Sequence, residues 1–210
     1  NGICLGLTGA YSRDLDISQL VDLLGVMNVK AMRNWMHLTS NLSDSKTVKE
    51  SMIRRQKSWL EQLRAAGVTK IVGMSHYWFL PDSVDVTGLD KNLARSAAPY
   101  RDTEEGSLYL EWLALYEESW YTMASAYPEV GFWEVGNEVN MDLYLHPLSY
   151  ETRGTTFTVA EKAEIVTDML YYASRGIHRA NPEAIVIFPG LAPITGFDCM
   201  ADFLELVYQN

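Results

Sequence analysis

Short apolar segments alternate with longer stretches of helical periodicity along the whole chain. Strands are predicted near residues 2–8, 29–35, 69–75, 130–138 and 184–188. Helices are predicted over residues 17–27, 45–66, 107–127, 159–180 and 200–208. This alternation predicts an α/β protein with a parallel sheet that is covered by helices.

Several predicted helix ends carry residues that favour a start or a stop. Gly67 follows the second helix and suits the left-handed position after a helix C-terminus. Thr158 and Glu161 have the spacing of a capping box, and Pro182 after Asn181 ends the same helix. These signals set the expected bounds of the two helices.

Two architectures fit the alternation, an open doubly wound sheet and a (β/α) barrel of the TIM type. The chain has neither G-x-G-x-x-G after its first strand nor G-x-x-x-x-G-K-[ST], so the nucleotide-binding open sheets lose support. The long segments 77–106 and 141–157 follow the third and fourth strands, where barrel enzymes carry their βα loops. The pattern therefore favours the barrel.

The length of the chain bears on how much of a barrel it contains. Five strand–helix units in 210 residues give 42 residues per unit (210/5). Eight such units would need about 340 residues, which is within the range of barrels with insertions. We therefore expect residues 1–210 to be one domain, the first five of eight units. The remainder of the barrel is expected from a segment after Asn210, which would cover the unpaired edge strands.

Composition excludes some classes of partner. The net charge of −10 argues against nucleic acid, because phosphate binding needs clustered Lys and Arg. No apolar run is long enough to span a bilayer, so no membrane is expected. The spacing of His, Cys, Asp and Glu matches no metal site, and no cofactor is expected. Cys4 and Cys199 are expected to be buried thiols. They do not decide the compartment, for which a secreted or cell-surface location is favoured.

Polar and aromatic side chains gather at the carboxyl ends of three predicted strands. The candidates are Arg33 and Trp35 after the second strand, His76, Tyr77 and Trp78 after the third, and Asn137 and Glu138 after the fourth. In a barrel these ends converge at one mouth. Rings that stack on sugar C–H groups, together with fixed polar groups, suit a polyhydroxylated ligand.

Glu134 and Glu138 lie in the same short stretch, FWEVGNEVN, and invite the reading of a catalytic pair. If the strand extends to residue 138, the two carboxylates share a face and Glu134 lies about 13 Å deeper. That separation is too long for the two carboxyls of a retaining glycosidase. We expect Glu134 to be a structural acid with a partner such as Arg33. Asn137 and Glu138 could face the lumen together only through a strand-end irregularity.

The segment Trp133-Glu134-Val135-Gly136-Asn137-Glu138 resembles the fourth-strand signature of the clan A retaining glycoside hydrolases, a (β/α)8 superfamily. The order of elements extends this resemblance over the whole chain. It implies that Glu138 is the general acid/base and that Asn137 binds the sugar 2-hydroxyl. It implies that Arg33 supports the nucleophile and His76 lies near the sugar. Val139 departs from the proline that many members have, which leaves the subfamily open.

The resemblance implies a hydrolase, a glycosidase of carbohydrate metabolism that degrades β-linked or arabinofuranosyl oligo- or polysaccharides. In the superfamily the nucleophile is a glutamate at the end of the seventh strand, and no residue of this chain matches it. Asp198 is more simply an N-cap of the last helix. We therefore expect the 210-residue chain alone to hydrolyse no glycoside.

Each candidate also has a structural interpretation. Arg33 could simply pair with Glu134, and His76 could be a packing residue. Trp35, Tyr77 and Trp78 are expected to be sugar platforms. Trp59, Trp112 and Trp120 are expected to pack helices, while His37 and His146 give no clear signal. Two other functions stay open, a non-catalytic carbohydrate-binding barrel and a barrel enzyme of unrelated chemistry.

Overall fold

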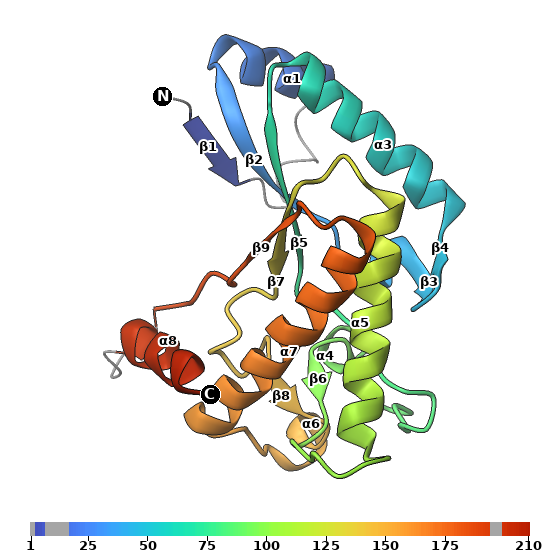
Figure 1. Ribbon diagram of the computed structural model, residues 1–210, viewed down its shortest axis with the longest axis vertical. Coiled ribbons are helices and arrows are strands. Elements are labelled where there is room, and N and C mark those ends of the chain that lie inside the picture. The colour runs from blue at the N-terminus through green and yellow to red at the C-terminus, as the bar shows by residue number, and fades with distance from the viewer. Residues whose placement is uncertain (1–2, 7–16, 194–198) are drawn as a thin grey trace.

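One parallel sheet forms the centre of the protein. The computed structural model describes residues 3–6, 17–193 and 199–210 (Figure 1). The strands are β1 (Ile3–Gly6), β2 (Val29–Trp35), β5 (Lys70–Ser75), β7 (Phe132–Val135) and β9 (Ile185–Ile187), and each is parallel to its neighbours in this order. Spatial order equals chain order, as in a barrel, whereas open doubly wound sheets reverse direction. The predicted α/β fold of the barrel type is confirmed.

Long helices follow the strands. They are α1 (Ile17–Val26), α3 (Glu50–Ala65), α5 (Leu108–Ala126), α7 (Val159–Ala180) and α8 (Cys199–Gln209). Figure 1 shows α3, α5 and α7 along one side of the sheet. The capping box of Thr158 and Glu161 is formed, Gly67 has a φ of 90°, and α7 ends directly before Asn181. These three expectations are confirmed.

The helix predicted from residue 45 begins later, at Glu50. The preceding residues form the short helix α2 (Leu38–Asn41) and a hairpin of β3 (Leu42–Asp44) and β4 (Thr47–Val48). The carboxylate of Asp44 accepts a hydrogen bond from the backbone N–H of Lys46 at 2.9 Å, which stabilises a turn rather than a helix.

The two long loops contain short elements of their own. The first contains α4 (Lys91–Ala94) and β6 (Ala97–Ala98), and the second contains β8 (His146–Pro147) and α6 (Tyr150–Arg153). β6 and β8 pair in parallel, which joins the loops to each other. Figure 1 places these elements beyond the carboxyl ends of β5 and β7. Both loops therefore lie at the edge of the sheet where the candidate site residues were predicted.

The fourth strand of the sheet is shorter than predicted, because β7 ends at Val135 instead of residue 138. Gly136 has a φ of 97° and Glu138 a φ of 48°, so the backbone leaves the extended conformation at this point. The N–H of Gly136 still donates to the carbonyl of Ser75 at 2.7 Å. The alternation of side chains expected over residues 134–138 therefore stops at Val135.

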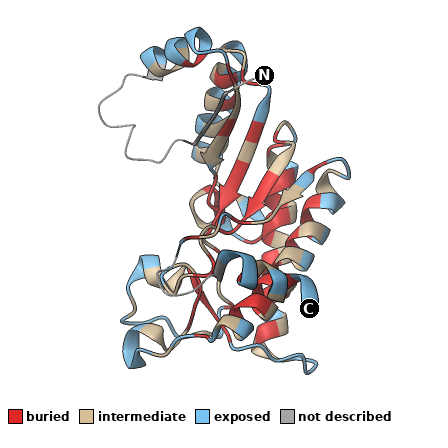
Figure 2. Cartoon of the chain, turned by 90° about the vertical axis from the view of Figure 1, so that its left-hand side faces the viewer, coloured by how far each residue is buried: buried red, intermediate tan, exposed pale blue. Residues whose placement is uncertain are grey.

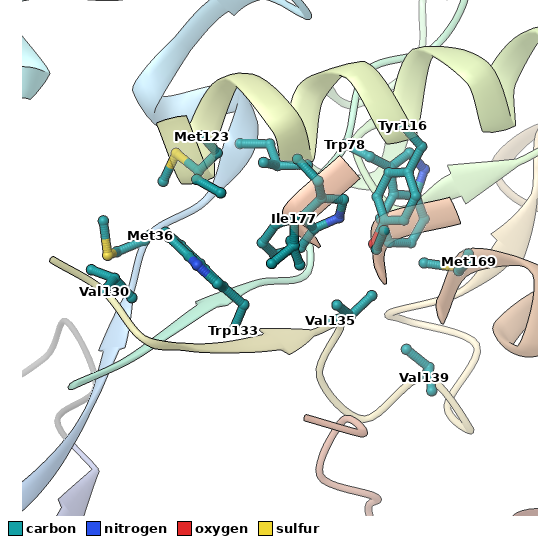
Figure 3. Close-up of a cluster of buried hydrophobic side chains, with 14 of the residues drawn as sticks. Met36, Trp78, Tyr116, Met123, Val130, Trp133, Val135, Val139, Met169 and Ile177 are labelled. Atoms are coloured by element: carbon teal, nitrogen blue, oxygen red, sulfur yellow. The ribbon is translucent and has the colours of Figure 1, made fainter. Parts of the chain in front are cut away.

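Aromatic and methionine side chains fill the space between the sheet and α5 and α7 (Figure 3). Trp112 and Trp120 are fully buried, which confirms their predicted packing role, and Trp59 is partly buried against the same core. Figure 2 shows buried residues along the strands and on the helix faces that cover them. Asp198 and the side chains of Cys4 and Cys199 lie outside the described residues.

No helix in the described ranges is long and apolar enough to cross a membrane.

The helices α5 and α7 approach each other closely at Gly176. A Cβ at this position would overlap the backbone carbonyl of Glu117, which cannot move without shifting α5. An alanine in a helix interior is normally more stable than glycine by about 1 kcal/mol, but overpacking costs about 1–3 kcal/mol. We predict that Gly176→Ala lowers the free energy of unfolding measured in urea.

The matched control for this substitution is Gly25→Ala in α1. Its Cβ would lie 3.7 Å from the nearest heavy atom, the carbonyl oxygen of Ala66, which is ordinary contact. Gly25→Ala should therefore leave stability unchanged or raise it. Equal effects of the two alanines would contradict the close packing of α5 on α7.

Candidate functional site

An arginine–glutamate ion pair crosses the face of the sheet that points away from α5. Arg33 in β2 donates to Glu134 in β7 through Nε at 2.5 Å and through Nη2 at 2.8 Å. Trp133 packs on Trp120 of α5, so the adjacent Glu134 faces the opposite side of the strand. Glu134 is buried, and a buried carboxylate needs such a partner. The expected pairing of Glu134 with an arginine is thus present.

Arg33 also fixes the residue that follows the turn at Gly136. Its Nη2 donates to the side-chain oxygen of Asn137 at 2.7 Å. The left-handed φ of Gly136 turns the chain so that Asn137 meets the same guanidinium as Glu134. The strand-end irregularity considered for this stretch is therefore observed, and it takes the form of a turn after Val135.

The loop after β9 completes the connection to Glu138. The backbone N–H of Gly190 donates to Glu134 at 3.0 Å, and the carbonyl of Gly190 accepts from the N–H of Glu138 at 2.7 Å. Both glutamates thus contact one residue. The expected 13 Å offset, which assumed an extended strand through residue 138, does not apply, because the chain turns at Gly136.

Beside this network lies a cluster of imidazole and aromatic rings, here called the ring cluster: Trp35, His37, His76, Tyr77 and Tyr144. The ring centroids of His37 and His76 are 4.4 Å apart. The centroid of the His76 ring is 4.1 Å from that of Tyr77 and 5.2 Å from that of Tyr144. Trp35 lies 5.8 Å from His76 and is 37% exposed. The cluster combines buried imidazoles with a ring that solvent can reach.

The two histidines of the ring cluster are held in the neutral form. Burial lowers the pKa of His37 to about 3, with further contributions from His76, Arg95 and Arg33. Burial, followed by the charge of Arg33, lowers the pKa of His76 to about 4. The Nδ1 atoms of both histidines are buried, and within the described part of the chain neither has a hydrogen-bond partner. Burial, rather than a hydrogen bond at Nδ1, therefore keeps these two imidazoles neutral.

Tyr144 connects the ring cluster with Glu138. Burial raises the pKa of the Tyr144 hydroxyl, and the charges of Glu138 and Tyr77 raise it further. The Glu138 carboxylate and the Tyr144 hydroxyl thus interact electrostatically. Glu138 and Asn137 are themselves half-buried. They can thus contact a molecule at the rim of the sheet.

Of the predicted site residues, Arg33, Trp35, His76, Tyr77, Asn137 and Glu138 lie at the carboxyl ends of β2, β5 and β7. Trp78 does not join them. It is 1% exposed, packs against Trp112 and Tyr116, and donates from its indole nitrogen to the carbonyl of Ala97 at 2.7 Å. Trp78 is a core residue and offers no surface to a ligand.

Sequence reasoning missed His37, Tyr144 and Gly190. His37 follows the end of β2 by two residues, and this position could have identified it. Tyr144 and Gly190 reach the site through contacts between loops, for which the sequence has no local signal. Among the described residues, no three His, Cys, Asp or Glu side chains are grouped as metal ligands.

No protein-family model matches the sequence, and no curated protein matches it. Solved structures do match the fold. A glycoside hydrolase family 5 enzyme from Prevotella bryantii B14 aligns with a TM-score of 0.62 and 14% identity, over 98% of this chain and 58% of that one. A GH5-4 broad-specificity endoglucanase from an uncultured bacterium aligns with a TM-score of 0.58 and 14% identity, over 91% and 51%.

A mutant of the Prevotella bryantii enzyme, solved in complex with a xyloglucan tetradecasaccharide, aligns with a TM-score of 0.55 and 14% identity, over 83% of this chain and 45% of that one. The chain thus spans about half the length of these enzymes, and the part that it spans has their fold. That fold is a (β/α) barrel.

The neutral histidines of the ring cluster make stability depend on pH. Below pH 6.5 the unfolded chain protonates its histidines, whereas His76 in the folded chain stays neutral down to about pH 4. The unfolded state then binds more protons, so stability falls as the pH decreases through this window. We predict that His76→Phe reduces the loss of unfolding free energy between pH 6.5 and 4 by about 3 kcal/mol.

Urea unfolding of the wild type and His76→Phe at several pH values between 6.5 and 4 measures the difference between their slopes. The exposed Tyr171→Phe in α7, which removes no histidine, is the control and should keep the wild-type slope. Parallel curves for the wild type and His76→Phe would contradict a buried neutral His76.

Proposed function

We propose that the chain is part of the catalytic barrel of a retaining glycoside hydrolase in which Glu138 is the general acid/base. The observation that carries the proposal is the double role of Arg33, which binds Glu134 and Asn137 at once. This arrangement fixes a turn at the carboxyl end of β7, where barrel enzymes carry their catalytic groups. Glu138 follows directly in that turn.

Each side chain of the site has a proposed task. Glu138 gives its proton to the glycosidic oxygen and then, as a carboxylate, removes a proton from the attacking water. Asn137, oriented by Arg33, donates from its amide nitrogen to the sugar 2-hydroxyl. His37 and His76, whose Nδ1 atoms are buried, support the rings of Trp35 and Tyr77. Trp35 and Tyr77 supply ring surface to the C–H groups of the sugar.

The proposed substrate is a β-linked or arabinofuranosyl oligo- or polysaccharide. The structural neighbours support a carbohydrate in general terms, since one of them was solved with xyloglucan. We propose no particular sugar for this site. Hydrolysis is therefore measured on a panel of aryl glycosides of several sugars, and the sugar that the wild type hydrolyses fastest is used for the variants.

A retaining mechanism needs a second carboxylate as nucleophile, and we assign this role to no residue between Asn1 and Asn210. β1 and β9 are the two edges of the sheet and could each accept another strand. We propose that such strands supply the nucleophile.

It follows that the 210-residue chain, purified alone, should hydrolyse no aryl glycoside, because the covalent intermediate cannot form. The complete gene product that contains this chain should hydrolyse at least one member of the same panel. Turnover by the purified 210-residue chain would contradict the assignment of the nucleophile to another segment.

In the complete gene product, Glu138→Gln should slow hydrolysis according to the leaving group. Acid catalysis is worth about 10²–10⁴-fold for a phenyl glycoside, whose leaving group must be protonated. A dinitrophenyl leaving group departs without a proton, so the step that releases it should slow much less. The measurement is kcat/KM for a series of aryl glycosides of one sugar.

Glu183→Gln is the matched control, since Glu183 is exposed and lies before β9 at the opposite end of the sheet. A uniform loss over all leaving groups in Glu138→Gln would contradict an acid/base role. If the wild type binds oligosaccharides but hydrolyses none, the protein is a non-catalytic carbohydrate-binding barrel. If it does neither, a barrel of unrelated chemistry replaces the proposal.

A further inference from the structure

A buried lysine in the first turn of α7 is the feature that the proposed function leaves unexplained. Lys162 is the fourth residue of α7 and is only 5% exposed. Lysine is almost never fully buried without a partner, and a cation is unfavourable near the positive end of a helix dipole. Two general preferences thus oppose a lysine at this position, so its contacts must compensate.

The contacts of Lys162 go to the turn that follows Glu138. Its ammonium donates to the backbone carbonyl of Asn140 at 3.0 Å and to the carboxylate of Asp142 at 2.6 Å. The bond to Asp142 joins two charged groups and is short, as expected for a strong hydrogen bond. Lys162 therefore holds two alternate residues of the turn from the helix side.

Asn140 is also held from the opposite side. Its side-chain amide donates to the carbonyl of Ala192 at 2.8 Å and accepts from the N–H of Ala192 at 3.0 Å. Lys162 on α7 and Ala192 after β9 thus fix Asn140 between them. Glu138 lies two residues before this fixed point and two residues after Gly136, which is itself bonded to Ser75.

The same turn carries a member of the ring cluster. The N–H of Met141 donates to the carbonyl of Glu138 at 2.8 Å, and the N–H of Tyr144 donates to the carbonyl of Met141 at 3.1 Å. A shift at Asn140 would therefore move both Glu138 and Tyr144. Their carboxylate and hydroxyl are the two groups that interact electrostatically at the rim.

We infer that Lys162 is a positioning residue, which sets the place of the Glu138 carboxyl by anchoring the turn through Asn140 and Asp142. The inference rests on the proposed function of Glu138. Lys162 touches no substrate in this role. A purely structural lysine would affect stability alone, whereas a positioning lysine affects proton donation to the leaving group.

Lys162→Met in the complete gene product tests the inference, because it keeps an unbranched side chain as long as the aliphatic part of lysine and removes the ammonium. Misplacement of a catalytic group by about 1 Å can cost about 10²-fold in rate. We expect kcat/KM for a phenyl glycoside to fall by at least about tenfold, while kcat/KM for a dinitrophenyl glycoside of the same sugar falls much less. Lys162→Arg keeps the cation and should recover part of the loss.

Lys30→Met is the matched control, because Lys30 lies at the amino end of β2 and donates to the carbonyl of Gly67. It should retain wild-type dependence on the leaving group. If the rate of Lys162→Met depends on the leaving group as in the wild type, while Glu138→Gln shows its expected dependence, the positioning role is overturned. The proposed function then stays intact. An unaffected Glu138→Gln overturns the proposed function instead.

Hydrogen exchange of the backbone amides gives a second measurement that needs no turnover. Lys162→Met should speed exchange over residues 138–145 and leave β7 unchanged, whereas Lys30→Met should change neither. Unchanged exchange over residues 138–145 in Lys162→Met would overturn the anchoring of the turn.

Discussion

The ion pair of Arg33 and Glu134 is the interaction on which the rest of the site depends. A carboxylate on the inner face of a parallel sheet loses most of its water, so it must be matched by charge and hydrogen bonds. Glu134 receives two bonds from Arg33 and one from Gly190. Because the guanidinium of Arg33 has a further N–H to donate, it also binds the side-chain oxygen of Asn137.

The ion pair of Glu134 distinguishes it from Glu138, although the sequence pattern suggests the same role for both glutamates. Glu134 and Glu138 are four residues apart in one apolar stretch, yet the first is engaged on the sheet and the second stands in the turn beyond it. The carbonyl of Gly190 joins the Glu138 backbone to the loop that also binds Glu134. The loop after β9 thus belongs to the site as much as the strand that carries the glutamates.

The sequence predicted best where the signal is local. The strand at 29–35, the capping box of Thr158 and the end of α3 before Gly67 depend on neighbouring residues, and all three are present. The grouping of Arg33, His76 and Asn137 followed from strand ends in a parallel sheet. The turn at Gly136 and the burial of Trp78 depend on contacts with distant residues, such as Gly190 and Trp112, and could not be predicted.

The central claim is that Arg33 and Glu134 hold a turn which presents Glu138 to a glycosidic bond. A crystal structure of the complete gene product with a sulfur-linked, non-hydrolysable oligosaccharide tests it most directly. The account predicts the Glu138 carboxyl within hydrogen-bond distance of the bridging sulfur, with Arg33 bound to Glu134 and Asn137. An oligosaccharide bound away from Glu138, or an Arg33 turned away from Glu134, would contradict it.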